Sequence, residues 1–347
     1  MIYITGDIHG ETLRIANLIE RFAVTPEDTI VILGDVGMNY YGNKHGDRRR
    51  KKQLNKHGIK VLCIHGNHEA RPESLITYHE EQWNGGTVYV EEEFPNLLFA
   101  KDGEAYDLEG CKAIAIGGAY SVDKWYRLQC DLHWFSDEQP SDEIKARVEK
   151  KLDELGWQVD AVLTHTCPFR YIPREAFLGG VDQSTVDNST ELWLDTIAER
   201  LDYKAWYCGH WHINKRIDKM HFVFEDVVSC VKPIRHYLSK GLSPAMAEYY
   251  ASGRKKIVAV AANNDFTLTI TFDNGENRRL DIKPHLRAGT VFEPFMQLEN
   301  FKRVYIDEQH CICWDIDPNI DSNQVWNNKV DLCPDCCYVD SIPCAEK

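Results

Sequence analysis

Five short groups of polar residues within the first 212 positions carry side chains that bind divalent metal ions. The groups are Asp7 with His9, Asp35, Asn67 with His68, His165, and His210 with His212. Carboxylate, imidazole and amide donors together suit an ion of borderline hardness, such as Mn, Fe, Co, Ni or Zn. An all-thiolate structural zinc site and an all-oxygen calcium site use different donors. The residue types therefore predict a site for one of the borderline ions.

Spacing within the groups supports this interpretation. The pair Asp7 and His9 lies two residues apart, as does the pair His210 and His212. In an extended segment such pairs point to the same side, because successive residues alternate faces. Glycines beside the ligands allow sharp turns and a close approach to a metal. A single Gly-Asp is normally only a turn, and a single histidine normally a satisfied surface or core residue, so the prediction depends on the joint set.

Each group comes directly after a run of apolar residues that is typical of a buried β-strand. Predicted strands cover residues 2–5, 30–33, 61–64, 96–100, 113–116, 161–164, 205–208 and 222–224, and predicted helices cover 12–22, 142–155 and 190–201. This alternation is typical of sheets buried under helices. Because sites in open α/β sheets gather at the carboxyl ends of strands, we expect the five groups to meet at one sheet edge.

A length of 347 residues accommodates a large α/β core and a smaller second domain. We expect a catalytic domain over residues 1–240, a helix-bearing linker over 241–255 and a mainly β domain over 256–347. In the last of these, strands are predicted over 257–261, 266–272, 279–282, 303–306 and 311–315. Asn274 and Gly275 carry the signal of a hairpin turn.

The formal net charge of −14 argues against a broad electrostatic contact with nucleic acid. We interpret the basic run at residues 48–52 as a solvated helix face. No segment reaches the roughly 20 apolar residues that span a bilayer. No targeting segment is recognisable either, so we expect a cytoplasmic protein without membrane contact.

The order of the motifs resembles the calcineurin-like metallophosphoesterase superfamily over about residues 1–230. The matching blocks are Gly6-Asp7-Ile8-His9-Gly10, Gly34-Asp35, Gly66-Asn67-His68-Glu69, His165 and Gly209-His210-Trp211-His212. The resemblance implies a four-layer α-β-β-α sandwich and hydrolysis of phosphoesters. One isolated Gly-Asp would carry no weight, whereas five ordered blocks are specific.

The resemblance also implies two divalent ions, with Mn favoured. Asp7, His9 and His212 would bind the first ion, Asn67, His165 and His210 the second, and Asp35 would bridge both. Two ions about 3.5–4 Å apart hold a shared water, lower its pKa to about 7 and clamp the phosphate. The bridging hydroxide would attack phosphorus, and His68 would protonate the leaving group.

One departure from the family pattern bears on the substrate. Ser/Thr phosphatases of this superfamily continue the second block as Gly-Asp-x-x-Asp-Arg-Gly, but here Met38 and Asn39 stand in place of the second Asp and the phosphate-binding Arg. A small phosphoester or nucleotide is therefore favoured over a phosphoprotein. Arg71 and Asn39 are candidate substrate contacts. The alternative for Arg71 is a solvent-facing salt bridge.

Two functional questions stay open at this stage. Residues 117–127, which are rich in Tyr, Trp and cations, form either a substrate-facing loop or a packed surface loop, with the packed loop slightly favoured. The chain could also be a catalytically silent binding scaffold that works through its C-terminal domain. The complete set of ligands favours an enzyme.

Residues 256–343 resemble a small bacterial domain of unknown function. The resemblance is carried by residues 265–275, 281–284 and 291–294 and by Trp314. We expect this domain to contact a protein partner or to recruit substrate. A structural zinc site at Cys311, Cys313, Cys333 and Cys336 is one interpretation of the cysteine spacing. The other is that the first two cysteines face one core from a strand.

Overall fold

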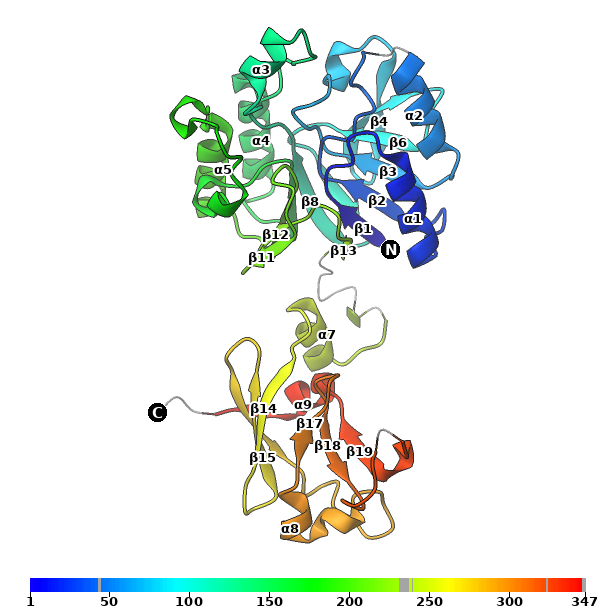
Figure 1. Cartoon of the computed structure of the whole chain (residues 1–347), viewed down its shortest axis with the longest axis vertical. Helices are drawn as coiled ribbons and strands as arrows, with labels where there is room; N and C mark the ends of the chain where they lie inside the picture. Colours follow the sequence, from blue (N-terminus) through cyan, green and yellow to red (C-terminus); the bar gives the residue numbers. More distant parts are fainter. Residues whose placement is uncertain (43–44, 231–236, 239, 323, 345–347) are drawn as a thin grey trace. The chain divides into compact units, whose positions relative to one another are not determined.

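The computed structural model describes residues 1–42, 45–230, 237–238, 240–322 and 324–344. The chain divides into two compact units, Met1–Pro233 and Ile234–Lys347 (Figure 1). Each unit has its own apolar core.

The first sheet of the N-terminal unit is built on four parallel strands. Its order is β13 (Val228–Ser229), β1 (Ile2–Thr5), β2 (Thr29–Ile32), β3 (Lys60–Cys63), β6 (Leu97–Ala100), β5 (Gly86–Glu91) and β4 (Tyr78–Trp83). Strands β1, β2, β3 and β6 run parallel, whereas β13 and the β4–β5 hairpin are antiparallel additions at the two edges. Every residue of β1 and β2 is buried, as expected of strands covered on both faces.

The second sheet has six strands. Its order is β11 (Lys215–Ile217), β12 (Met220–Phe222), β10 (Ala205–Cys208), β9 (Ala161–Thr164), β8 (Cys111–Ile116) and β7 (Ala105–Leu108). Strands β8, β9, β10 and β12 are parallel, and β7 and β11 close the sheet as antiparallel edges.

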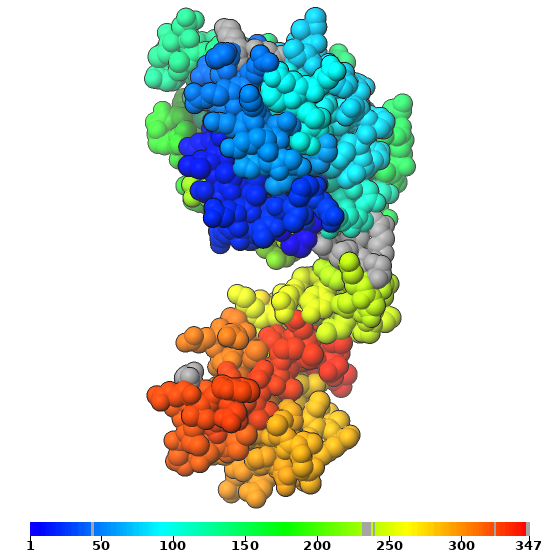
Figure 2. All heavy atoms as spheres, turned by 90° about the vertical axis from the view of Figure 1, so that its right-hand side faces the viewer, coloured from blue at the N-terminus to red at the C-terminus, as the bar shows by residue number. Residues whose placement is uncertain are grey.

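Helices cover the outer face of each sheet. Beside the first sheet are α1 (Thr12–Phe22) and α2 (His45–Asn55), and beside the second are α4 (Asp142–Glu154) and α5 (Ser189–Arg200) (Figure 1). Short helical segments follow in the loops: η1 (Pro72–Ser74), α3 (Lys124–Gln129), η2 (Phe169–Tyr171), η3 (Arg174–Ala176) and η4 (Gln183–Thr185). Figure 2 shows the blue segment that contains α1 and α2 as a continuous covering on one face of this unit.

Three apolar clusters separate the four layers. The inner cluster joins the two sheets, with Leu33 and Leu62 from the first and Leu163 and Tyr207 from the second. The outer clusters lie between each sheet and its helices. This arrangement confirms the expected α-β-β-α sandwich.

The C-terminal unit is mainly β, as expected. Its sheets have the orders β14 (Ile257–Ala262), β15 (Thr267–Phe272), β16 (Asn277–Asp281), β20 (Ile342–Pro343) and β17 (Tyr305–Ile306), β18 (Ile312–Asp315), β19 (Lys329–Leu332). Its helical segments are α7 (Pro244–Ala251), η5 (Glu293–Met296), α8 (Leu298–Phe301), η6 (Trp326–Asn328) and α9 (Pro334–Asp340). Helix α7 falls in the segment expected to be a linker, and it is part of this unit because the Tyr249 hydroxyl donates to Asp335 at 2.7 Å.

Among the described helices, none combines the length and the apolar character that a membrane crossing requires.

Candidate metal centre

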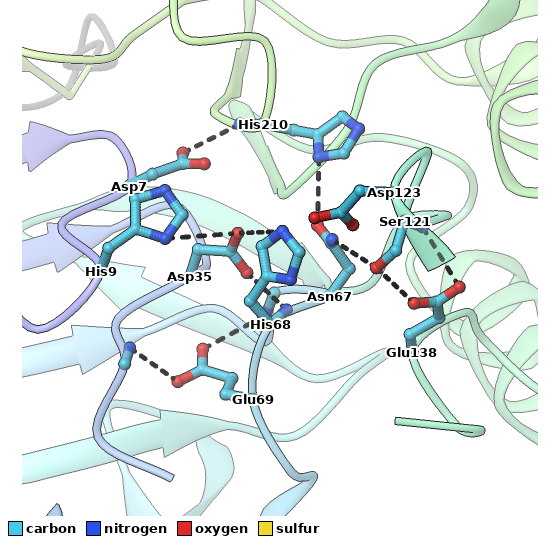
Figure 3. Close-up of polar contacts among 12 residues, drawn as sticks. Asp7, His9, Asp35, Asn67, His68, Glu69, Ser121, Asp123, Glu138 and His210 are labelled. Atoms are coloured by element: carbon cyan, nitrogen blue, oxygen red, sulfur yellow. Dashed lines mark hydrogen bonds and ion pairs between the residues drawn. The ribbon is translucent and has the colours of Figure 1, made fainter. Parts of the chain in front are cut away.

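The structure brings all seven predicted ligands to the carboxyl ends of strands from both sheets. Figure 3 shows Asp7, His9, Asp35, Asn67 and His210 among them. Asp7 and His9 follow β1, Asp35 follows β2, Asn67 follows β3, His165 follows β9, and His210 and His212 follow β10. The inner apolar layer packs the two sheets together, so ligands from distant parts of the chain meet at one place.

The first cluster consists of Asp7, His9 and His212, which offer ligand atoms within 4.8 Å of one another. His9 Nε2 and His212 Nε2 are 3.1 Å apart, and His212 Nε2 is 3.3 Å from Asp7 Oδ2. Asp7 Oδ2 is enclosed and accepts no hydrogen bond from the described residues. A buried carboxylate with one long contact to an imidazole is costly unless a cation neutralises it, so this cluster fits a metal ion.

The second cluster centres on the side-chain oxygen of Asn67. This oxygen is 2.8 Å from His165 Nε2 and 3.1 Å from His210 Nδ1. The Asn67 amide donates to Ser121 Oγ at 2.9 Å, which turns the oxygen toward the histidines. His165 Nδ1 lies 2.8 Å from the carbonyl oxygen of Leu33. With the proton on Nδ1, the lone pair on Nε2 is free to bind a metal ion.

Asp35 lies between the two clusters and is 2% exposed. Its Oδ1 is 3.6 Å from His165 Nε2, and its Oδ2 is 3.9 Å from His9 Nδ1. Burial alone would raise the pKa of Asp35, but the imidazoles of His165 and His68 outweigh burial and hold this pKa below its ordinary value. A carboxylate that stays ionised between the two clusters is suited to bridging two cations.

Four of the ligands have backbone conformations that side chains rarely adopt. The φ angles of His9, Asp35, His210 and His212 are +46°, +47°, +65° and +50°. Left-handed conformations at residues other than glycine are costly and concentrate at functional sites. These conformations therefore mark the loops after β1, β2 and β10 as a candidate functional site.

Two glycines permit the close approach of the loops. A Cβ atom at Gly66 would overlap the carboxylate of Asp35, and a Cβ atom at Gly209 would overlap that of Asp7. The ligand blocks contain glycine at these positions because no other residue leaves room for the neighbouring carboxylate.

Sequence reasoning assigned no role to Glu69, which is fully buried beneath the centre. Its carboxyl group accepts hydrogen bonds from the backbone N–H groups of Val36, Gly37 and Gly66, at 3.2, 3.2 and 3.3 Å. Burial, together with the charge of Asp35, raises the pKa of Glu69 to about 8. Glu69 thus ties the loop after β2 to the loop after β3. Its position in the block Gly66-Asn67-His68-Glu69, directly after His68, was the sequence signal that could have indicated a role for Glu69 in the site.

A cavity of about 620 Å³ opens above the ligands, and His9, Asp35, Asn67, His68, His210 and His212 form part of its lining. His68 Nε2 lies 3.9 Å from Asp35 Oδ2. Burial lowers the pKa of His68, whereas the carboxylates of Asp35 and Asp123 act in the opposite direction. The predicted general acid therefore borders the space in which a substrate would react.

The two predicted substrate contacts lie outside this cavity. Arg71 is 5% exposed and forms an ion pair with Asp102, with 2.5 Å between Nη1 and Oδ2. The alternative given for Arg71, a salt bridge, is therefore present, but it is buried and not solvent-facing. Asn39 is fully buried, and its side-chain oxygen accepts from the hydroxyl of Tyr78 at 3.0 Å. Both side chains therefore bind other residues of the protein. Their partners, Asp102 and Tyr78, are distant in the sequence, so the local sequence does not reveal them.

A four-layer sandwich that gathers Asp, His and Asn side chains at its strand ends is the arrangement expected of a phosphoester hydrolase. The chain belongs to the calcineurin-like phosphoesterase family, whose model matches residues 1–214. This family generally binds divalent metals. Residues 257–336 match a domain of unknown function, DUF2442.

No curated protein matches the chain. Among solved structures, it is similar to a phosphopantetheinyl hydrolase from Mycobacterium tuberculosis, with 13% identity, a TM-score of 0.36 and coverage of 70% of this chain and 93% of the other. It is also similar to a protein of unknown function, AQ665, from Aquifex aeolicus, with 12% identity, a TM-score of 0.27 and coverage of 70% and 99%.

Proposed function

We propose that the N-terminal unit is a dinuclear metal-dependent phosphoester hydrolase. The two clusters described above would each hold one divalent ion, with Mn favoured, and Asp35 would be shared between them. The observation that carries this proposal is that Asp7 lies within reach of two groups of metal-binding side chains, His9 with His212 and Asp35 with His165. Two bound ions would supply an activated water at neutral pH and would neutralise the charge on the phosphoryl oxygens.

The remaining chemistry belongs to side chains of the protein. Hydrolysis forms a bond from a water oxygen to phosphorus and breaks the bond from phosphorus to the alcohol oxygen, which needs a proton. We assign that proton to His68, because its ring borders the cavity next to Asp35. Asn67 and His165 are oriented by Ser121 and Leu33, so they need little reorganisation when substrate binds.

We further propose that the substrate is a small phosphoester or nucleotide. The position that carries the phosphate-binding Arg in Ser/Thr phosphatases is the buried Asn39, which disfavours a phosphoprotein. A phosphoprotein Ser/Thr phosphatase remains the alternative within the enzyme class.

Turnover of a generic aryl phosphate and an aryl phosphodiester by the full chain tests the proposal. The protein is stripped with a chelator and then assayed with and without added Mn²⁺, while the metal content is measured by mass spectrometry. We expect two ions per chain and hydrolysis that depends on them. Two bound ions without turnover of any ester would instead support the catalytically silent scaffold.

A structural zinc ion in the C-terminal unit stays a separate prediction. Cys333 Sγ accepts from the backbone N–H of Cys336 at 3.4 Å, and Cys313 is fully buried. The groups of potential metal ligands found among the described residues do not include these cysteines. Zinc bound to the full chain that disappears in Cys336→Ser would support the site, and unchanged metal content would remove it.

A further inference from the structure

The cavity wall contains two arginines that neither the family motifs nor the ligand set explains. Arg127 comes from α3, and Arg50 comes from the basic run that was interpreted as a solvated helix face. Both line the same cavity as His68 and Asp35. The basic run is therefore not simply a solvated face, since Arg50 borders the cavity and Lys51 is buried beside Glu91.

Arg127 is held in place from two sides. Its Nε donates to Asp123 Oδ2 at 2.8 Å, and its Nη1 donates to the carbonyl oxygen of His133 at 3.1 Å. Its side chain is only 15% exposed. A guanidinium group that is fixed in this way is preorganised, and its planar set of N–H donors matches phosphate oxygens.

Arg50 is likewise fixed beside the centre. Its Nη1 donates to the carbonyl oxygen of Gly37 at 3.1 Å, and its guanidinium lies 5.6 Å from the ring centroid of Tyr41. Gly37 follows the bridging residue Asp35 by two positions, so this contact attaches the cation to the ligand loop itself. The cavity thus places positive charge near the ligands without using position 39.

Another part of the wall is apolar. It consists of Phe177, Leu178, Val181, Val186, Trp211 and Ile213. The rings of Phe177 and Trp211 have centroids 6.2 Å apart, and Trp211 lies between the ligands His210 and His212 in the chain. Leu178 is 63% exposed, so its apolar surface faces solvent in the absence of a ligand. An apolar surface within a cavity favours a ligand that carries an apolar group.

We propose that Arg127 and Arg50 bind the phosphoryl oxygens of the substrate and that the apolar wall binds its alcohol part. The substrate would then be a phosphoester of an aromatic or otherwise apolar alcohol. This inference rests on the proposed hydrolase function and names the substrate class of that same site. Within residues 117–127, the proposal makes Val122, Asp123 and Arg127 substrate-facing, because these residues line the cavity, whereas residues 117–121 are packed.

Binding of phosphonates, which cannot be hydrolysed, tests the inference separately from catalysis. The inhibition constants of methylphosphonate and phenylphosphonate are measured on the metal-loaded full chain, with calorimetry as a second readout. We expect phenylphosphonate to bind at least about fivefold more tightly, because only its ring meets the apolar wall. Phe177→Ala should remove that preference and leave methylphosphonate binding unchanged.

The role of the arginines is tested by substitution. Arg127→Gln should weaken the binding of both phosphonates by about tenfold or more, and Arg127→Lys should recover only part of this lost affinity. Arg170→Gln is the matched control, because Arg170 pairs with Asp195 and Glu199 outside the cavity. Thermal unfolding confirms that each variant is folded.

The two possible failures are distinguishable. In the first, the wild-type chain hydrolyses esters but binds both phosphonates equally, and Arg127→Gln and Arg170→Gln bind them with the same affinity. This result overturns the substrate assignment and leaves the hydrolase function intact. A wild-type chain that loads two metals and hydrolyses no ester overturns the function, and the inference with it.

Discussion

The floor and the wall of the cavity are built from different parts of the chain. The floor consists of side chains at strand ends, enclosed and fixed by buried partners such as Ser121 and Glu69. The wall consists of α2, α3 and the loop segment around residues 176–188, with exposed apolar groups such as Leu178. In the proposed function the floor determines which reaction is carried out, and in the proposed substrate class the wall determines which phosphoester is accepted. Substitutions in the two regions should differ accordingly.

The largest effect is expected at the shared ligand. Asp35→Asn removes the charge between the two clusters and should lower kcat/KM by about 10³-fold or more, since metal ions contribute several kcal/mol to the transition state. Metal content measured beside kinetics should fall in parallel. A variant that keeps two ions and full activity would contradict the assignment of Asp35 and of the floor as a whole.

The second prediction concerns the pH dependence of the free energy of unfolding, through a buried carboxyl group next to the floor. Glu191 is 3% exposed and accepts from the hydroxyl of Thr166 at 2.8 Å, and burial raises its pKa to about 7 from an ordinary value of 4.5. Between these values Glu191 is protonated in the folded chain and ionised in the unfolded chain. The free energy of unfolding should therefore fall as pH rises through this window, by roughly 3 kcal/mol at most.

Chemical denaturation at a series of pH values measures this dependence. Glu191→Gln, which stays neutral in both states, should flatten it, and Glu154→Gln on the exposed face of α4 should not. Identical pH profiles for wild type and Glu191→Gln would show that Glu191 is not held neutral.

A pair of alanine substitutions contrasts the floor and the wall directly. Gly209→Ala places a methyl group against the Asp7 carboxylate and the carbonyl oxygen of Leu33, and it should cost about 1–3 kcal/mol of stability together with metal affinity. Gly179→Ala, in the wall loop, meets no atom within 4 Å and should change stability by less than about 0.5 kcal/mol. Thermal unfolding and metal titration compare them. Equal effects would mean that floor and wall are packed alike.

The smallest effect is expected at Ser121, which contacts a predicted ligand but is not itself one. Ser121→Ala removes the acceptor that orients the Asn67 amide and should weaken metal binding by about tenfold. Ser184→Ala is the control for a metal titration, because the hydroxyl of Ser184 donates to the exposed Asp182. If both variants bind metal as the wild type does, the contact between Ser121 and Asn67 is incidental.

The sequence predicts the floor much better than the wall, for a physical reason. Each ligand directly follows a buried strand, and strand burial is visible as a local apolar run. Arg71 and Arg127 illustrate the opposite case, since both are cations that lie outside the strands. The two arginines differ in their partners. Arg71 pairs with Asp102, 31 residues away, whereas Arg127 is held beside the cavity by Asp123, the residue directly before its own helix.

The fold shows the same division between local and distant signals. The strands β1, β9 and β10 have the predicted bounds, because each is a short apolar run that ends at a glycine or a ligand. The β4–β5 hairpin was missed, although Asn84 and Gly85 at its turn have the positive φ values that an Asn-Gly hairpin requires. Strand β4 is largely exposed, so it lacks the apolar pattern on which the other predictions depended.

The division of the ligands between two sheets makes the centre sensitive to a distant region. Asp7, Asp35 and Asn67 are anchored to one sheet and His165, His210 and His212 to the other, and an apolar layer packs the two sheets together. A larger side chain at Ala115 in that layer would wedge the sheets apart and stretch the centre, although it touches no ligand. The catalytic rate would then depend on how tightly side chains pack between the two sheets.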